Sequence, residues 1–182
     1  MNTLKSNRRR SVSKIGEIDF KDAVAKSMST LSRQDGAHRL TINTTIEGLI
    51  PFHSDREMID ILFINILSNA IKFRHPHEAR PKCDIHVDLN TEEAILSFRD
   101  NGIGIDKEYL GKVFDMFFCV PGAKTDGSGL GLFAAKEAVK KIKGNIKVDS
   151  IKGTGTVFSV VLPNLMDNDM KRKFNKLIEN SK

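Results

Sequence analysis

Residues 63–73, FINILSNAIKF, form an apolar stretch interrupted by a few polar side chains. At about 100° per residue in an α-helix, Asn65, Asn69 and Lys72 fall in one narrow sector of the helical wheel. Ser68 lies beside them. An asparagine buried without hydrogen-bond partners costs roughly 1–3 kcal/mol. The spacing therefore predicts a helix that packs on a sheet and turns its polar stripe either to bulk water or into a cleft.

A second group of candidate residues lies in DNGIGI, residues 100–105, directly after a strand-like run. Gly102 and Gly104 allow backbone geometry that is closed to other residues, and they let a ligand approach the chain closely. Asp100 can accept a hydrogen bond from an exocyclic amine such as that of adenine. A tight turn without a ligand explains this motif equally well, so it indicates a nucleotide site only in combination with other motifs.

The third group is GSGLGL, residues 127–132, which follows a loop and opens a helix-like pattern. The unpaired amides of a helix N-terminus form a natural cradle for phosphate. The motif lacks the Gly-Lys-Ser/Thr ending of a P-loop, and it does not follow a strand as the Rossmann turn does. It therefore predicts a phosphate-binding helix N-terminus of another kind.

The helix that carries the polar stripe has sequence signals at both ends. Ser54 and Asp55 offer an N-cap. Pro76 disfavours helical geometry just before itself, so we expect the helix to end near Arg74. Apolar residues at helical spacing predict three further helices, over residues 20–31, 106–117 and 130–143.

Alternation of apolar and polar residues with period two predicts strands over residues 39–45, 83–89, 94–100, 145–151 and 155–163. Short polar connections, NTEE and KGTG, indicate that the second and third strands are antiparallel neighbours, and likewise the last two. Helices and strands do not alternate strictly, which disfavours a doubly wound parallel sheet. We expect an α+β fold, a two-layer α/β sandwich with a mixed, mainly antiparallel sheet and helices on one face.

Length and composition exclude several function classes. A chain of 182 residues suffices for one full core, and no apolar run approaches the ~20 residues that span a bilayer. Cys83 and Cys119 are the only cysteines, which favours a reducing compartment without a disulfide framework or a metal site. The net charge of +6 includes basic clusters in residues 8–10 and 171–176. Aromatic residues do not interleave with these clusters, so we expect no nucleic-acid partner.

Taken in this order, the motifs resemble the ATP-binding domain of histidine kinases in the GHKL superfamily, which includes gyrase-type and chaperone ATPases. The resemblance covers residues 18–163. NILSNAIKF resembles the N box, DNGIGI and GSGLGL the two G boxes, VFDMFF the F box, and GTGTVFSVVLP the last strand. It implies the GHKL (Bergerat) fold over residues 17–164, after a poorly ordered linker remnant at 1–16 and before a polar tail at 165–182. The implied protein is a bacterial two-component sensor histidine kinase.

The resemblance also implies roles for the candidate residues, with ATP and Mg²⁺ as ligands. The residue that matches Asn69 ligates the magnesium ion bridging the ATP phosphates, and Asn65 is expected to flank the metal and the γ-phosphate. Lys72 offers a charge to the phosphates, so that Asn65 and Lys72 are the expected catalytic residues. Asp100 matches the aspartate that reads adenine. The other expected ATP-binding residues are Gly102, Gly104, Ile105, Lys124, Gly127, Ser128, Gly129, Leu130, Gly131 and Thr156.

The residue at position 65 separates the subfamilies of this superfamily. The hydrolases and the related anti-sigma serine kinases carry a glutamate there as general base, whereas an asparagine cannot take a proton from water. Asn65 therefore indicates transfer of the phosphoryl group to a histidine. His77 precedes Glu78, as in a phosphoacceptor motif, but it lies after the N box and between two prolines, where a connecting loop is expected.

We therefore expect the phosphoacceptor histidine on a dimerisation domain outside this chain, with no autophosphorylation by this chain alone. The expected partners are that domain and a downstream response regulator. We expect no membrane segment in this chain and a cytoplasmic location, with any membrane anchor elsewhere in the full-length protein. The alternative is a catalytically silent nucleotide-binding module of the same superfamily, which regulates through an ATP-dependent lid at residues 118–128.

Overall fold

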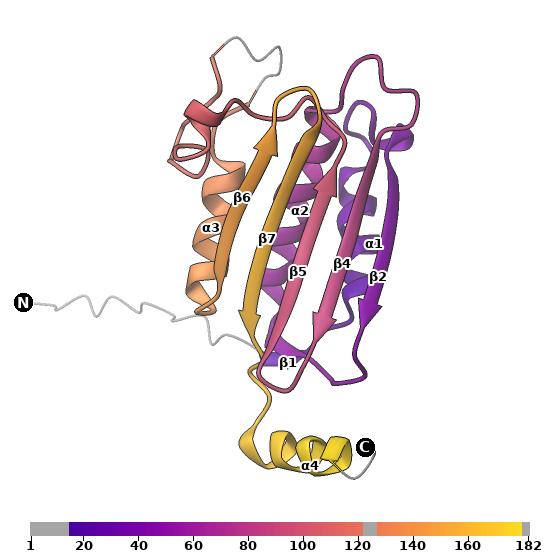
Figure 1. Ribbon diagram of the computed structural model, residues 1–182, viewed down its shortest axis with the longest axis vertical. Helices are drawn as coiled ribbons and strands as arrows, with labels where there is room; N and C mark the ends of the chain where they lie inside the picture. The colour runs from indigo at the N-terminus through magenta and orange to yellow at the C-terminus, as the bar shows by residue number, and fades with distance from the viewer. Residues whose placement is uncertain (1–14, 122–126, 180–182) are drawn as a thin grey trace, which may run out of the picture.

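The structure is a computed structural model, and it describes residues 15–121 and 127–179. Its centre is a five-stranded sheet with the strand order β2-β4-β5-β7-β6 (Figure 1). In this order, the strands are β2 (Thr41–Glu47), β4 (Lys82–Leu89), β5 (Glu93–Asp100), β7 (Gly155–Pro163) and β6 (Asn145–Ile151). The β2–β4 pair is parallel and the other three pairs are antiparallel. The sheet is therefore mixed and mainly antiparallel, as expected from the sequence.

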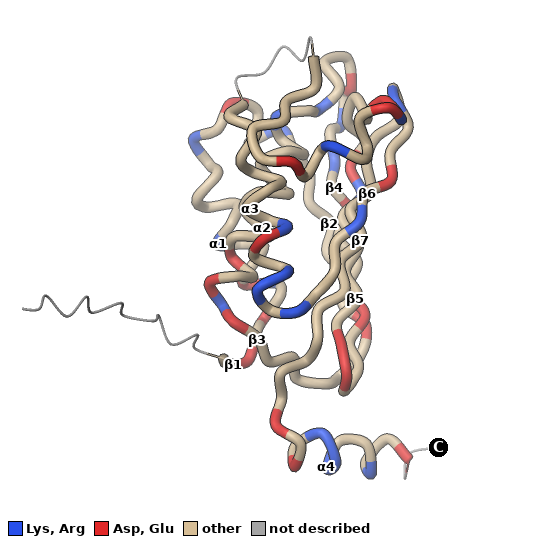
Figure 2. Tube along the Cα trace, turned by 90° about the vertical axis from the view of Figure 1, so that its left-hand side faces the viewer, with Lys and Arg blue, Asp and Glu red and all other residues tan. Residues whose placement is uncertain are grey.

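Three helices, α1 (Phe20–Leu31), α2 (Arg56–Lys72) and α3 (Gly131–Lys141), cover one face of this sheet. Figure 2 shows the helices and the strands as two separate layers. Burial alternates along β4, β5 and β7, and the more exposed face of the sheet has no helix against it in the described part of the chain (Figure 2). The predicted two-layer α/β sandwich is confirmed.

The ends of α2 follow from its sequence. The Asp55 carboxylate caps the helix by accepting hydrogen bonds from the backbone amides of Glu57 and Met58. At the other end, the Phe73 amide donates to the Asn69 carbonyl oxygen, and helical geometry stops at Lys72. This is two residues before the expected end, because the residues preceding Pro76 already leave the helical conformation.

A cluster of aromatic rings joins the helix layer to the sheet. The ring of Phe63 on α2 meets Phe98 on β5 edge to face, with centroids 5.1 Å apart and an interplanar angle of 78°. Phe20 on α1 lies 6.0 Å from Phe63 and 5.3 Å from Phe52, centroid to centroid. All four side chains are almost completely buried. Edge-to-face pairs of this kind contribute about 0.5–1.5 kcal/mol beyond the burial of their area.

A second, two-stranded sheet pairs β1 (Ile15–Glu17) with β3 (His53–Asp55). Sequence reasoning missed both strands, because three residues are too few to show a period-two pattern. Strand β1 spans the expected boundary between residues 16 and 17. The division into linker, domain and tail remains a prediction, since most of the expected linker lies outside the described residues.

The expected polar tail contains a helix, α4 (Asn168–Glu179), which lies beyond one end of the sheet (Figure 1). Asn164 anchors the segment leading to it by accepting from the backbone amides of His53 and Met166 and donating to the Pro51 carbonyl oxygen. On α4 itself, Lys171 pairs with Glu92 in the β4–β5 turn.

The helix expected over residues 106–117 is not present, and that prediction was wrong. The segment has one 3₁₀ turn, Lys107–Tyr109, followed by further turns. Its amides bond three residues back rather than four, as Lys112 does to Tyr109 and Asp115 to Lys112. Gly111, in the middle of the segment, disfavours a continuous helix because of its backbone freedom. A second short 3₁₀ turn, Ala37–Arg39, precedes β2.

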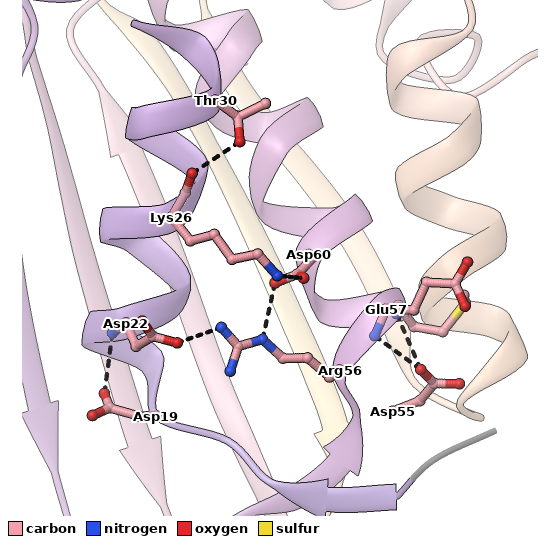
Figure 3. A network of polar contacts seen from close by, with 9 residues as sticks. Asp19, Asp22, Lys26, Thr30, Asp55, Arg56, Glu57 and Asp60 are labelled. Carbon is pink, nitrogen blue, oxygen red and sulfur yellow. Dashed lines mark hydrogen bonds and ion pairs between the residues drawn. The ribbon is translucent and has the colours of Figure 1, made fainter.

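Helices α1 and α2 are joined by a chain of charged side chains, two from each helix (Figure 3). Arg56 pairs with Asp22 and places its Nε 3.0 Å from the Asp60 carboxylate, which also pairs with Lys26. The hydrogen bond to Asp22 and the charges of both carboxylates raise the pKa of Arg56 above its ordinary value. Arg56 thus links a carboxylate on each helix.

We predict that Arg56→Met lowers the free energy of unfolding by about 1 kcal/mol, because both carboxylates lose their shared cation while the aliphatic packing is kept. The loss should shrink in 1 M salt, which screens exposed charges. Urea unfolding at low and high salt measures the loss of unfolding free energy and its salt dependence. Lys140→Met is the control, since Lys140 is 76% exposed and its nitrogen lies 3.7 Å from Glu137. Equal effects of the two substitutions would contradict the linking role.

Candidate nucleotide-binding site

A cavity of about 630 Å³ opens between α2, the end of β5 and the start of α3. It brings together most of the residues expected from the sequence, although they are spread over more than ninety positions of the chain. The expected residues that line it are Asn65, Asn69, Lys72, Asp100, Gly104, Ile105, Gly127, Ser128, Gly129, Gly131 and Thr156. The polar stripe of α2 therefore faces a cavity, which resolves the choice left open by its spacing.

The amide of Asn65 has a defined orientation. Its Nδ2 donates to the Ile61 carbonyl oxygen one turn earlier, at 2.8 Å. Its Oδ1 points towards the first residue of α3, where a Cβ added to Gly131 would lie 3.0 Å from it. Asn65 consequently presents an oxygen, rather than an N–H group, beside the N-terminus of α3.

Asp100 lies at the end of β5 with one carboxylate oxygen already bonded. Its Oδ1 accepts from the Gly102 amide at 2.8 Å and from the Thr156 amide at 3.2 Å. Burial raises the pKa of Asp100 above its ordinary value, and these two hydrogen bonds oppose the rise because they stabilise the ionised form. The other oxygen, Oδ2, remains available to a ligand.

The two glycines after Asp100 serve different purposes. A Cβ on Gly102 would lie 2.4 Å from the Phe73 carbonyl oxygen, so Gly102 lets this loop pack against the end of α2 and lies outside the cavity lining. Gly104 does line the cavity. It has a φ of +65°, and a Cβ there would lie 2.1 Å from the Ile151 carbonyl oxygen, so no other residue fits without a backbone shift.

The segment before α3 supplies the last wall. Gly129, with a φ of +68°, accepts a hydrogen bond from the Phe117 amide at 3.1 Å and approaches the Phe117 backbone closely. Leu130 precedes the helix and lies outside the lining, with 38% of its surface exposed. Lys124, expected as a phosphate contact in the lid, lies outside the described residues.

Phe114 and Phe117 lie in the segment that was expected to be helical, and their rings have different surroundings. Phe114 packs edge to face against Phe158, with centroids 6.3 Å apart. Phe117 is 68% exposed and has a φ of +64°. The left-handed backbone at Phe117 breaks the helical repeat, so its exposed ring does not share a face with Phe114.

Much of the cavity wall was not foreseen from the sequence. Its apolar part includes Phe73, Ile103, Val113, Phe118, Val120, Leu132 and Phe158. Phe73 could have been found, because it directly follows Lys72 in the N box. The others come from loops, from the first turn of α3 and from the inner face of a strand, where period-based reasoning indicates burial but not a ligand site.

The charged lining is sparse. In residues 15–121 and 127–179, the lysines on the wall are Lys72 and Lys152, and Lys152 pairs with Asp106 at the rim.

Residues 15–121 and 127–179 contain no group of three or more histidine, cysteine or carboxylate side chains that could hold a metal ion. A divalent cation would instead find the amide oxygens of Asn65 and Asn69, together with oxygens of the ligand itself. Mg²⁺ accepts such a set, because it prefers oxygen and binds through few protein groups.

The chain matches a known family and several curated relatives. The model of the family described as histidine kinase-, DNA gyrase B- and HSP90-like ATPase matches residues 54–166. The sensor protein RprX of Bacteroides fragilis is 30% identical over 172 residues, which are 90% of this chain and 32% of RprX. The sensor histidine kinase WalK of Bacillus subtilis is 42% identical over 114 residues, 60% of this chain and 18% of WalK. This chain thus spans less than a third of the length of either relative.

Solved structures share the fold. A mycobacterial sensor histidine kinase, MprB, has a TM-score of 0.67 at 24% identity, with 84% of this chain and 97% of that chain covered. The nucleotide-free catalytic domain of the histidine kinase ThkA also has a TM-score of 0.67, at 20% identity, with 83% and 98% covered. None of the helices described is both long and apolar enough to cross a membrane. Because the family model matches more than half of this chain, the chain belongs to the histidine kinase-, DNA gyrase B- and HSP90-like ATPases, and the curated relatives named above are a sensor protein and a sensor histidine kinase.

Proposed function

We propose that this chain is the ATP-binding catalytic domain of a two-component sensor histidine kinase. It would transfer the γ-phosphoryl group of ATP to a histidine on a separate dimerisation and phosphoacceptor domain, with a response regulator as the downstream partner. One observation carries the proposal. The polar stripe of α2 and the carboxylate of Asp100 line the same cavity, which the N-terminus of α3 also lines.

The base and the phosphates would bind at different ends of this cavity. Asp100 Oδ2 accepts a proton from the exocyclic amine of adenine, and the apolar wall packs against the base. The backbone amides before α3 point at the phosphates, where the helix dipole also favours negative charge. Lys72 adds a point charge on a flexible stem.

Asn69 and Asn65 are the residues that would hold the magnesium ion, through their amide oxygens. The ion supplies charge neutralisation on the phosphates as the γ-phosphoryl group leaves. The fixed orientation of Asn65 supports this assignment, because its Nδ2 is engaged by Ile61 and its Oδ1 is the atom turned to the site.

The chemistry at residue 65 favours transfer over hydrolysis. An amide has no basic nitrogen, so Asn65 cannot activate a water molecule as a glutamate does. An imidazole nitrogen needs no such base, because its lone pair attacks the γ-phosphorus directly while the bond to ADP breaks. Deprotonation of an attacking water molecule is thus left uncatalysed, whereas an incoming histidine can attack the γ-phosphorus without a base.

Transfer in trans tests the proposal. Wild-type protein is mixed with γ-labelled ATP, Mg²⁺ and a purified phosphoacceptor domain of a sensor histidine kinase. Label should appear on that domain and should be absent when its histidine is replaced by alanine. ATP binding without transfer to any acceptor would favour the catalytically silent regulatory module instead.

We predict that Asn69→Ala lowers the affinity for Mg-ATP at least about tenfold, since one ligand of the cation is lost. The fold should survive, because the side chain faces the cavity and not the core. Calorimetric titration with and without Mg²⁺ measures the affinity, and circular dichroism checks the fold. Asn145→Ala, at the exposed start of β6, is the matched control. Unchanged Mg-ATP affinity in Asn69→Ala would remove this residue from the metal site.

We predict that Asp100→Asn weakens ATP binding about tenfold, because a charged acceptor of the adenine amine is lost. The same change should help the fold near neutral pH. A raised pKa in the folded state means that protonated Asp100 stabilises the protein below about pH 3.8, and that this contribution is lost as the pH rises through the raised value. The stability of Asp100→Asn relative to wild type should therefore increase from pH 4 to pH 7.

Urea unfolding at the two pH values and calorimetry at pH 7 measure these effects. Unchanged ATP affinity would speak against the adenine-reading role. A fall in the relative stability of the variant over the same pH range would show that burial does not dominate at Asp100.

A further inference from the structure

The hydroxyl group of Ser150, on β6, has three hydrogen-bond partners just behind the cavity wall. The Ile105 amide donates to Ser150 Oγ at 2.9 Å. Ser150 Oγ lies 2.7 Å from the Gly155 carbonyl oxygen and 3.1 Å from Thr156 Oγ1. Ser150 itself is half-buried, whereas Thr156 is buried and lines the cavity.

The direction of each hydrogen bond follows from the number of protons. A serine hydroxyl has one proton to donate and two lone pairs to accept with. A carbonyl oxygen only accepts, so the single proton of Ser150 goes to Gly155. The Ile105 amide only donates, and it uses one lone pair of Ser150. The contact with Thr156 can then form in one way, with Thr156 as the donor and Ser150 as the acceptor.

Thr156 is thereby left as a hydrogen-bond acceptor towards the cavity, because its own proton is held by Ser150. Its backbone amide donates to Asp100 Oδ1 at 3.2 Å, so the two residues are immediate neighbours. The wall at this point offers two acceptors, the Thr156 hydroxyl oxygen and Asp100 Oδ2. An exocyclic amino group has two protons and can satisfy both, whereas a carbonyl oxygen would face two acceptors without a proton.

We infer that Ser150 is a positioning residue that sets base selectivity, by holding Thr156 as an acceptor so that the site selects 6-amino over 6-oxo purine nucleotides. This inference rests on the proposed ATP binding. Ser150 acts through Thr156 and does not touch the nucleotide.

The loop after β5 does not need Ser150 to stay in place, because other contacts attach this loop to the β6–β7 hairpin. The Gly153 amide donates to the Ile103 carbonyl oxygen at 2.7 Å. Gly104 also packs directly on the Ile151 backbone. The loop after β5 is therefore fastened to the β6–β7 hairpin by backbone contacts that a change at Ser150 leaves in place.

The test compares ATP with inosine triphosphate, which carries a carbonyl group in place of the 6-amino group. Wild-type protein should bind ATP more tightly. In Ser150→Ala, the Thr156 hydroxyl can rotate and donate to the carbonyl oxygen, so the preference for ATP should fall about fivefold, the effect of one neutral hydrogen bond. Ser150→Thr keeps the hydroxyl and should restore the preference. Ser159→Ala, on the opposite face of the sheet, is the matched control and should leave it unchanged.

Thr156→Val removes the acceptor directly and should lower the preference for ATP even if Ser150→Ala folds poorly. An unchanged preference in folded Ser150→Ala, or equal losses for both nucleotides, would overturn the inference while the proposed ATP binding stands. Failure of wild-type protein to bind either nucleotide would overturn both, and the wild-type titration alone reveals that case.

Discussion

The edge-to-face contact between Phe63 and Phe98 sets the rotation of α2 on the sheet, and the site depends on that rotation. Both rings are almost fully buried, so α2 cannot turn about its axis without opening a void in the core. Once Phe63 faces the sheet, the helical repeat places Asn65 and Asn69 at the cavity. A shift of one residue in this contact would carry both amides into the core or out to the surface.

The two layers of the fold each contribute one end of the cavity. Helices α2 and α3 provide the amide stripe and the glycine-rich N-terminus, which suit phosphates and a cation. The sheet provides Asp100 and Thr156, which suit the base. These sheet residues meet because Gly155, with no side chain, lets the start of β7 approach the Asp100 carbonyl oxygen so closely that a Cβ would lie 2.1 Å from it. The spacing between the proposed base and phosphate sites is thus fixed by helix-on-sheet packing.

The sequence predicted the elements whose signals are local. The predicted cap at Asp55 and the apolar spacing from residue 20 gave the starts of α2 and α1 correctly, and period-two patterns located the strands of the main sheet. The segment 106–117 failed because its apolar spacing fits a helix, while its amides bond three residues back. The pair between Lys152 and Asp106 joins a hairpin turn to a loop, and no periodicity reports such a contact. The hydroxyl network at Ser150 depends on proton directions, which sequence patterns do not contain.

The charges on the cavity wall show what must balance the charge of a bound nucleotide triphosphate. In the described part of the chain, Lys72 and Lys152 face three carboxylates, Asp100, Asp106 and Glu108. Lys152 is already engaged by Asp106, so the wall's side chains as a whole are not positive. In the proposed function, a divalent cation and the backbone amides at the α3 N-terminus would compensate a bound triphosphate, and the dipole effect there is confined to the first turn. Under that proposal, nucleotide binding would depend on the cation more than on either lysine of the described wall, because one of the two is already paired with a carboxylate.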